Sequence, residues 1–113
     1  MEIRSQSADD ATVVALSGEL DGKTAPAAQQ QIVPLIPDGG KLVLDMHQVG
    51  YMSSAGLRMM LLLYRQALAK GTKIALAGLS EDIRDTMSAT GFLDFFVVSD
   101  TVDEGLTLLR EAT

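Results

Sequence analysis

Cysteine and tryptophan are absent from the 113 residues of the chain, and histidine occurs once. Without cysteine the chain forms no disulfide and offers no thiolate ligand, which is typical of proteins from a reducing compartment. A single histidine among scattered carboxylates also gives no recognisable metal-ligand spacing. We therefore expect neither a metal site nor a cofactor.

Positive charge and long apolar runs are also scarce. Lys and Arg number 9 against 15 Asp and Glu, a formal net charge of -6, and no stretch gathers basic residues around aromatic ones. Because an acidic surface repels phosphate backbones, we exclude nucleic acid as a partner. The longest apolar run, Met59 to Tyr64, is far shorter than the roughly 18 residues that cross a bilayer. The first residues, Met1 to Gln6, lack the features of a secretion signal, so we expect a cytoplasmic protein with no membrane contact.

The length of the chain and its 47% hydrophobic content suit one small domain over residues 1–113. Apolar periodicity and turn signals predict strands over residues 3–7, 11–20, 41–46, 73–79 and 95–98, with a turn at Asp9-Asp10. The same signals predict helices over residues 24–36, 53–70, 80–91 and from residue 101 onward. This order predicts an α/β fold with a mixed, mostly parallel sheet, an antiparallel N-terminal edge strand and about four helices.

Two adjacent serines, Ser53 and Ser54, precede the longest predicted helix. A serine at this position is typical of a helix N-cap, because its oxygen accepts from a free amide of the first turn. The N-terminus of a helix also favours a phosphate through its free N–H groups and its dipole. The serine pair therefore has two interpretations, a structural cap and a phosphorylation switch.

The predicted central helix carries more apolar residues than one buried face requires. Leu57, Met60, Leu61, Tyr64 and Leu68 share one face at helical spacing, and we expect them to pack on the sheet. Met59 and Leu62 lie on a different side, next to charged and polar residues. Either a neighbouring helix covers these two side chains or they form a patch for a partner, and the same patch would also suit a homodimer.

Catalytic motifs are largely missing. A Ser-His-Asp arrangement would have to combine His47 with Ser53 or Ser54, but the sequence around Ser54 is not the G-x-S-x-G elbow of hydrolases. We interpret His47 as a solvated loop residue after a strand. Neither a P-loop nor a G-x-G-x-x-G turn is present, so nucleotide binding is not predicted and we do not expect an enzyme.

Four segments resemble one family in their order and spacing. These are Gly18-Glu19-Leu20-Asp21, Leu42-Val43-Leu44-Asp45, Tyr51-Met52-Ser53-Ser54-Ala55-Gly56-Leu57-Arg58 and Ala77-Gly78-Leu79. Together they are similar to the STAS domain of bacterial anti-sigma-factor antagonists, and the resemblance covers essentially the whole chain. It implies a protein that binds a serine-kinase anti-sigma factor with a GHKL-type ATPase fold when unphosphorylated. Phosphorylation by that kinase ends the binding, and a PP2C-type phosphatase restores it.

The resemblance also implies roles for individual residues. The family usually has D-S-x-G-L at the switch, so Ser54 takes the phosphorylated position, while Ser53 replaces the aspartate and is a secondary candidate for phosphorylation. Asp21 and Asp45 match acidic positions near the switch, and we expect both to lie close to Ser54. With the patch on the central helix, the expected partner-binding residues are Asp21, Asp45, Ser53, Gly56, Leu57, Arg58, Met59 and Leu62.

Two alternatives to the switch remain open at this point. In the first, the chain is a STAS-like scaffold in which Ser54 is only an N-cap, and it binds a partner or a small ligand without phosphorylation. In the second, it is a small hydrolase that uses Ser54 and His47.

Overall fold

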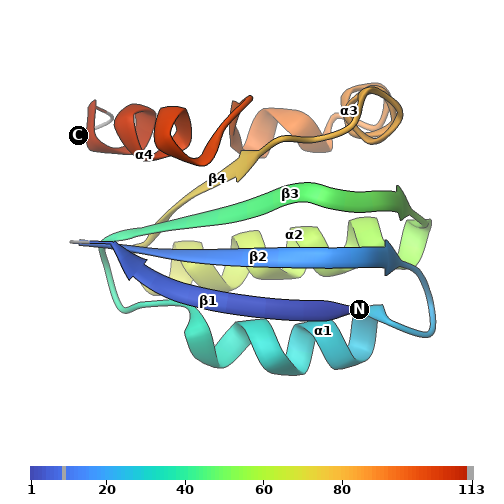
Figure 1. Cartoon of the computed structure of the whole chain (residues 1–113), viewed down its shortest axis with the longest axis horizontal. Coiled ribbons are helices and arrows are strands. Elements are labelled where there is room, and N and C mark those ends of the chain that lie inside the picture. The colour runs from blue at the N-terminus through green and yellow to red at the C-terminus, as the bar shows by residue number, and fades with distance from the viewer. Residues whose placement is uncertain (9, 112–113) are drawn as a thin grey trace.

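The computed structural model describes residues 1–8 and 10–111 and contains a five-stranded sheet in the spatial order β1-β2-β3-β4-β5 (Figure 1). The strands are β1 (Glu2–Ala8), β2 (Ala11–Leu20), β3 (Lys41–Met52), β4 (Lys73–Ala77) and β5 (Val97–Ser99). Strand β1 pairs with β2 in antiparallel orientation, and all later neighbours are parallel. The predicted fold class is therefore confirmed. The turn predicted at Asp9-Asp10 includes residue 9, which lies outside the described residues.

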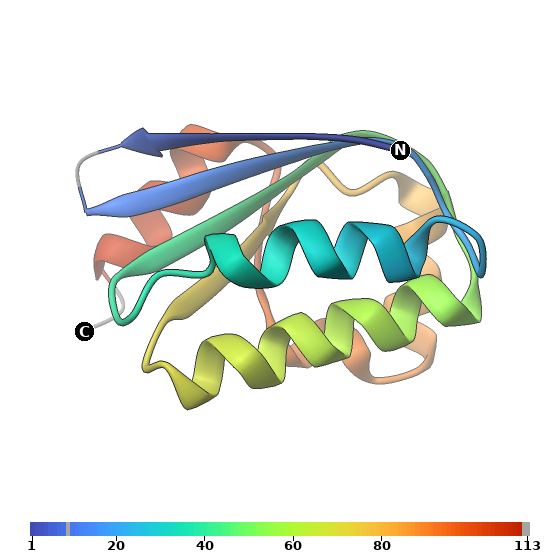
Figure 2. The same ribbon diagram turned by 90° about the horizontal axis from the view of Figure 1, so that it is seen from below.

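Helices cover both faces of this sheet. The α-helices are α1 (Ala25–Ile32), α2 (Ser54–Ala69), α3 (Glu81–Ala89) and α4 (Val102–Glu111), and the short 3-10 turns are η1 (Val33–Leu35) and η2 (Phe92–Phe95). Helices α1 and α2 lie side by side on one face, and α4 lies on the other (Figure 2). Within the described part of the chain, no helix is long and apolar enough to cross a bilayer.

Alternation along the strands divides the core into two layers. Leu42 and Leu44 point into the larger layer with α1 and α2, whereas Val43 points into the smaller one with Leu106 and Leu109 of α4. Successive side chains of a strand point to opposite faces, so a strand covered on both sides has an unbroken apolar run. The prediction of a doubly covered strand at this point is confirmed.

Strand β3 is much longer than the sequence predicts. It continues beyond Met46 to Met52, and it pairs in parallel with β2 as far as Leu20. The pairing shifts register twice, each time with an extra residue in β3, and these bulges interrupt the regular alternation of buried and exposed residues. Because the segment after Met46 is partly polar and irregular, its sequence resembles a loop. His47 therefore lies in a strand, and its assignment to a loop was wrong.

The last two strand predictions were also misplaced at their ends. Strand β4 stops at Ala77 instead of Leu79, and β5 begins at Val97 instead of Phe95. Residues 92–95 form the 3-10 turn η2, which follows Gly91 in the left-handed conformation at φ 80°. Phe95 of this turn and Phe96 directly after it make ring contacts with Tyr64 of α2, and neither residue belongs to β5.

Helix α2 is buried on two sides, because it contacts both the sheet and α1. Leu57 and Met60 are buried as predicted, but Leu68 is 65% exposed, so it is not packed into the core as expected. Met59, in contrast, is only 3% exposed, and Leu63 is fully buried. A neighbouring helix therefore covers Met59, which is one of the two alternatives that the sequence left open.

Candidate functional site

The two serines occupy different positions at the start of α2. Ser53 is the N-cap, with extended backbone (φ -85°, ψ 179°), and its hydroxyl accepts a hydrogen bond of 3.4 Å from the Gly56 amide. Ser54 is the first residue inside the helix, and its side chain is exposed. The cap is therefore satisfied without Ser54, and the N-cap role that the scaffold alternative assigns to Ser54 is wrong.

A backbone hydrogen bond holds this helix start against the end of β2. The Ser53 amide donates to the Leu20 carbonyl at 2.8 Å, while the Ser53 carbonyl accepts the first bond of the helix, from the Leu57 amide at 3.0 Å. Because Asp21 directly follows Leu20 and Ser54 directly follows Ser53, the bond between Ser53 and Leu20 brings Asp21 and Ser54 to the same edge of the molecule. The expected proximity of Asp21 to the serine pair agrees with this arrangement.

Gly56 allows α2 to approach β2 closely. A Cβ atom at this position would lie 2.9 Å from the Leu20 carbonyl oxygen and 2.8 Å from the Met52 side chain. Real Cβ atoms do not make such contacts with backbone, so any larger residue would push the first turn of α2 outward. Gly56 and Leu57 are therefore buried residues that fix the position of the first turn of α2, and little of their surface is accessible to a partner.

Asp21 organises the turn that leads into α1. One carboxylate oxygen accepts hydrogen bonds from the amides of Lys23 (2.9 Å) and Thr24 (3.0 Å), and the Thr24 hydroxyl donates to the Glu19 carbonyl at 2.6 Å. The amide bonds from Thr24 and Lys23 lower the pKa of Asp21, so the carboxylate keeps its charge in mildly acidic solution. The half-exposed carboxylate is thus a negative charge held in place at the turn between β2 and α1.

Asp45 is not part of this edge. It occupies the face of β3 that carries Val43 and α4, and Met52 lies seven residues further along, a separation on the order of 20 Å at about 3.3 Å per residue. Its carboxylate lies 2.6 Å from Nδ1 of His47. The expectation that Asp45 lies close to Ser54 was therefore wrong, because the unrecognised length of β3 separates the two residues.

His47 belongs to the same remote face. The Asp45 carboxylate accepts a hydrogen bond from Nδ1 of protonated His47, and this bond raises the pKa of His47, although partial burial opposes the shift. The ring also lies over Gly78, where a Cβ atom would come within 2.4 Å of it. Among the described residues, His47 forms no hydrogen bond with Ser53 or Ser54, so the geometry does not support a serine hydrolase.

A groove between α1 and α2 begins beside the serine pair. Its volume is about 430 Å³, and its walls include Gly22, Pro26 and Gln29 from the α1 side and Arg58 and Leu62 from α2. Arg58 is exposed and Leu62 is half-buried, so both side chains are accessible in the groove. Met59 also lines the groove, but it is buried and lies at the bottom. The sequence did not reveal Pro26 and Gln29 as wall residues, because it does not show which helices are neighbours.

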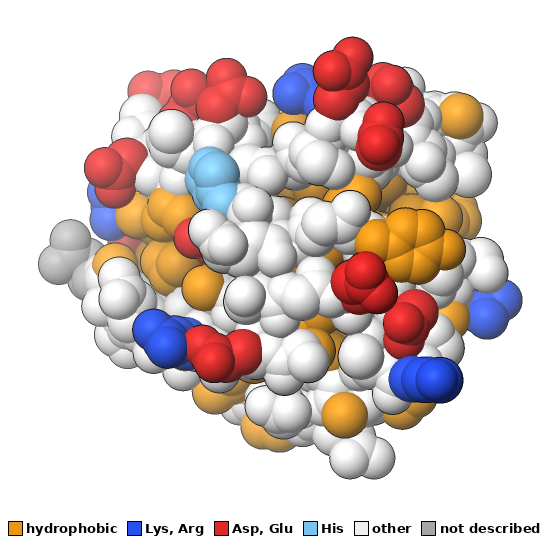
Figure 3. Space-filling view, turned by 45° about the vertical axis from the view of Figure 1, so that its right-hand side comes forward, with side chains coloured by type: hydrophobic (Ala, Val, Ile, Leu, Met, Phe, Trp, Pro, Cys, Tyr) orange, Lys and Arg blue, Asp and Glu red, His pale blue; other side chains and the backbone are white. Residues whose placement is uncertain are grey.

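Acidic side chains are spread over the face shown in Figure 3, and basic ones are fewer there. Within the described part of the chain, no three His, Cys, Asp or Glu side chains come together as metal ligands. The groups available beside the serine pair are the Ser54 hydroxyl, the Asp21 carboxylate and the Arg58 guanidinium, next to the partly apolar groove between α1 and α2.

Comparisons with known proteins place this arrangement in context. The family model of the STAS domain matches residues 2–105. The anti-sigma-B factor antagonist of Bacillus subtilis (strain 168) is 29% identical over 93 residues, which cover 82% of this chain and 85% of that protein. A crystal structure of an anti-sigma factor antagonist from Mycobacterium paratuberculosis is 30% identical, with a TM-score of 0.80 and coverage of 96% and 93%. The anti-sigma factor antagonist SpoIIAA in its unphosphorylated form shares the fold, with a TM-score of 0.78, 19% identity and coverage of 97% of each chain.

Proposed function

Because the chain belongs to the STAS-domain family of anti-sigma factor antagonists, we propose that it binds an anti-sigma factor and that phosphorylation of Ser54 ends the binding. The family resemblance implies that the partner is a serine kinase with a GHKL-type ATPase fold and that a PP2C-type phosphatase reverses the modification. In this proposal the protein acts in the cytoplasm and performs no catalysis of its own. The observation that carries the proposal is the exposed Ser54 hydroxyl, which the Ser53 cap leaves available.

The proposed docking surface joins the serine pair to the groove between α1 and α2. Ser54, the turn at Asp21, and the side chains of Arg58 and Leu62 border it. Gly56, Leu57 and Met59 lie beneath this surface and set its shape, whereas Asp45 lies outside it. A partner that binds over Ser54 would thus contact both charged groups and apolar side chains.

A phosphate on Ser54 would switch this surface through charge. The group adds about -1.5 to -2 charges to a chain whose net charge is -6, and it would lie at the same edge as the Asp21 carboxylate. The N-terminus of α2 stabilises an exposed phosphate, because free amides and the helix dipole favour an anion there. A partner surface over Ser54 would instead have to desolvate that anion, which is costly unless a cation pairs with it.

The experiment uses the serine kinase encoded nearest to the gene, together with ATP and measurement of intact mass. We expect a gain of one phosphoryl group, lost in Ser54→Ala and retained in Ser53→Ala. In binding assays, Ser54→Ala should hold the kinase even in the presence of ATP, and Ser54→Asp should weaken binding at least tenfold, or about 1.4 kcal/mol.

Thr107→Asp is the matched control, because it adds the same charge at an exposed position of α4 on the other face of the sheet. It should bind like the unmodified protein. If Ser54→Asp and Ser54→Ala bound equally well, the switch would be wrong. A partner complex that forms without any mass gain at Ser54 would favour the unphosphorylated scaffold instead.

A further inference from the structure

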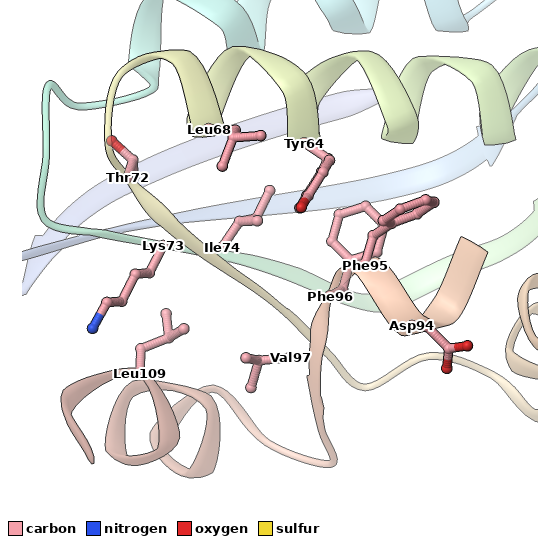
Figure 4. Close-up of a pocket in the computed structure, with 10 residues that line it drawn as sticks. All are labelled: Tyr64, Leu68, Thr72, Lys73, Ile74, Asp94, Phe95, Phe96, Val97 and Leu109. Carbon is pink, nitrogen blue, oxygen red and sulfur yellow. The ribbon is translucent and has the colours of Figure 1, made fainter. Parts of the chain in front are cut away.

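A second surface lies at the other end of α2. An apolar groove of about 380 Å³ lies between the C-terminal half of α2, the start of β4, η2 and α4 (Figure 4). Its apolar walls include Tyr64, Leu68, Ile74, Phe95 and Leu109.

This groove concentrates the exposed apolar side chains of the molecule. Three large hydrophobic residues are exposed in the described part of the chain, namely Tyr51 (52%), Leu68 (65%) and Phe95 (45%). Leu68 and Phe95 both border the groove, and the ring of Phe95 lies 5.2 Å from that of Tyr64. Large apolar side chains gathered on one surface mark an interaction site more often than isolated ones do.

The groove exists because the edge of the sheet is incomplete. Strand β5 begins with Val97 opposite Ala75, so among the described residues β4 has no strand neighbour on that side at Lys73 and Ile74. The chain before Val97 turns away as η2, where the Phe96 amide donates to the Leu93 carbonyl at 3.1 Å. An uncovered strand edge beside an apolar groove is an open site for another chain.

We propose that a second copy of this chain occupies the groove and that the protein forms a twofold symmetric dimer through it. Lys73 and Asp94 lie on opposite sides of the groove, and neither has an ion-pair partner among the described residues (Figure 4). In a twofold symmetric contact the same surface of both copies meets, rotated by a half-turn. Lys73 of each copy would then face Asp94 of the other copy, which gives two ion pairs. A small acid or a small amine would satisfy only one of these two charges.

The dimer would leave the proposed phosphorylation site free. Leu68 follows Ser54 by 14 positions on α2, which corresponds to about 21 Å along the helix at about 1.5 Å per residue. Each dimer would thus present two Ser54 surfaces at separate ends. The inference therefore stands independently of the proposed function.

Sedimentation velocity over protein concentrations from about 1 µM to about 1 mM tests the dimer. Leu68→Ser should weaken association at least tenfold, because it removes an exposed apolar side chain from the contact. Tyr51→Ser is the matched control, since Tyr51 is similarly exposed but does not line the groove, and it should leave association unchanged. Circular dichroism confirms that each variant is folded.

Charge reversal gives a sharper test. Lys73→Asp alone and Asp94→Lys alone should each weaken association on the order of tenfold, because the dimer contains two copies of each contact. A mixture of these two variants should associate like the parent protein, since both interchain pairs are then opposite in charge again. A parent protein that stays monomeric at every concentration would overturn the proposal. Association that is insensitive to Leu68, Lys73 and Asp94 would overturn it too.

Discussion

Ser53 and Ser54 have identical side chains but different roles, because the backbone changes from extended at Ser53 to helical at Ser54. Ser53 has extended backbone, so its hydroxyl reaches the Gly56 amide, whereas Ser54 has helical backbone and points its hydroxyl to solvent. An aspartate at position 53, as the resemblance expects, would fill the same cap, because Asp and Ser are both favoured N-caps. The replacement of that carboxylate therefore preserves the helix start and removes one negative charge next to Ser54.

The stability of variants should separate the two serines. Ser53→Ala should lower the free energy of unfolding by about 1 kcal/mol, since the Gly56 amide loses its acceptor. Ser53→Asp should retain the parent stability, and Ser54→Ala should change it by less than about 0.5 kcal/mol. Urea denaturation of the three variants measures these differences. A larger loss for Ser54→Ala than for Ser53→Ala would contradict the assignment of the cap.

Helix α2 contributes to both proposed contact surfaces, with Ser54 at its start in the docking surface and Leu68 near its end in the apolar groove. Its burial is wider than a single stripe, because the sheet covers one side and α1 covers another. The sequence predicted the sheet-facing residues Leu57 and Met60, which follow helical spacing. The side that faces α1 could not be distinguished from a partner surface, since an adjacent helix of the same chain and a foreign protein require the same apolar residues.

Substitutions at Met59 and Leu62 should separate these two uses of an apolar residue. Met59→Ala should destabilise the fold by about 2 kcal/mol or more, because it empties a buried position between α1 and α2. Leu62→Ala, at a half-buried groove position, should cost less stability and should weaken binding to the proposed anti-sigma factor. Thermal denaturation and a binding assay on the same two proteins measure both effects. Equal stability losses at the two positions would contradict the described packing of α1 on α2.

At the scale of the whole molecule, regular elements were easier to predict than their ends. The alternation of strands and helices, the antiparallel first strand and the doubly covered β3 follow from local periodicity and chain order. The extension of β3 from His47 to Met52 could not be predicted, because its pairing with β2 depends on two bulges. That extension decides the composition of the candidate site: it holds Ser53 next to Leu20 and leaves Asp45 remote.

The architecture predicts that phosphorylation changes binding without changing the fold. Ser54 is exposed, and no hydrogen bond of the described structure uses its hydroxyl, so a phosphate displaces nothing in the core. The helix dipole should offset the repulsion from Asp21, and the free energy of unfolding should therefore stay within about 1 kcal/mol of the parent value. Two-dimensional NMR of the phosphorylated protein should show shifts near residues 20–24 and 53–58, with the α4 layer around Leu106 unchanged. Shifts that spread through this layer would indicate a conformational switch and would contradict a purely electrostatic one.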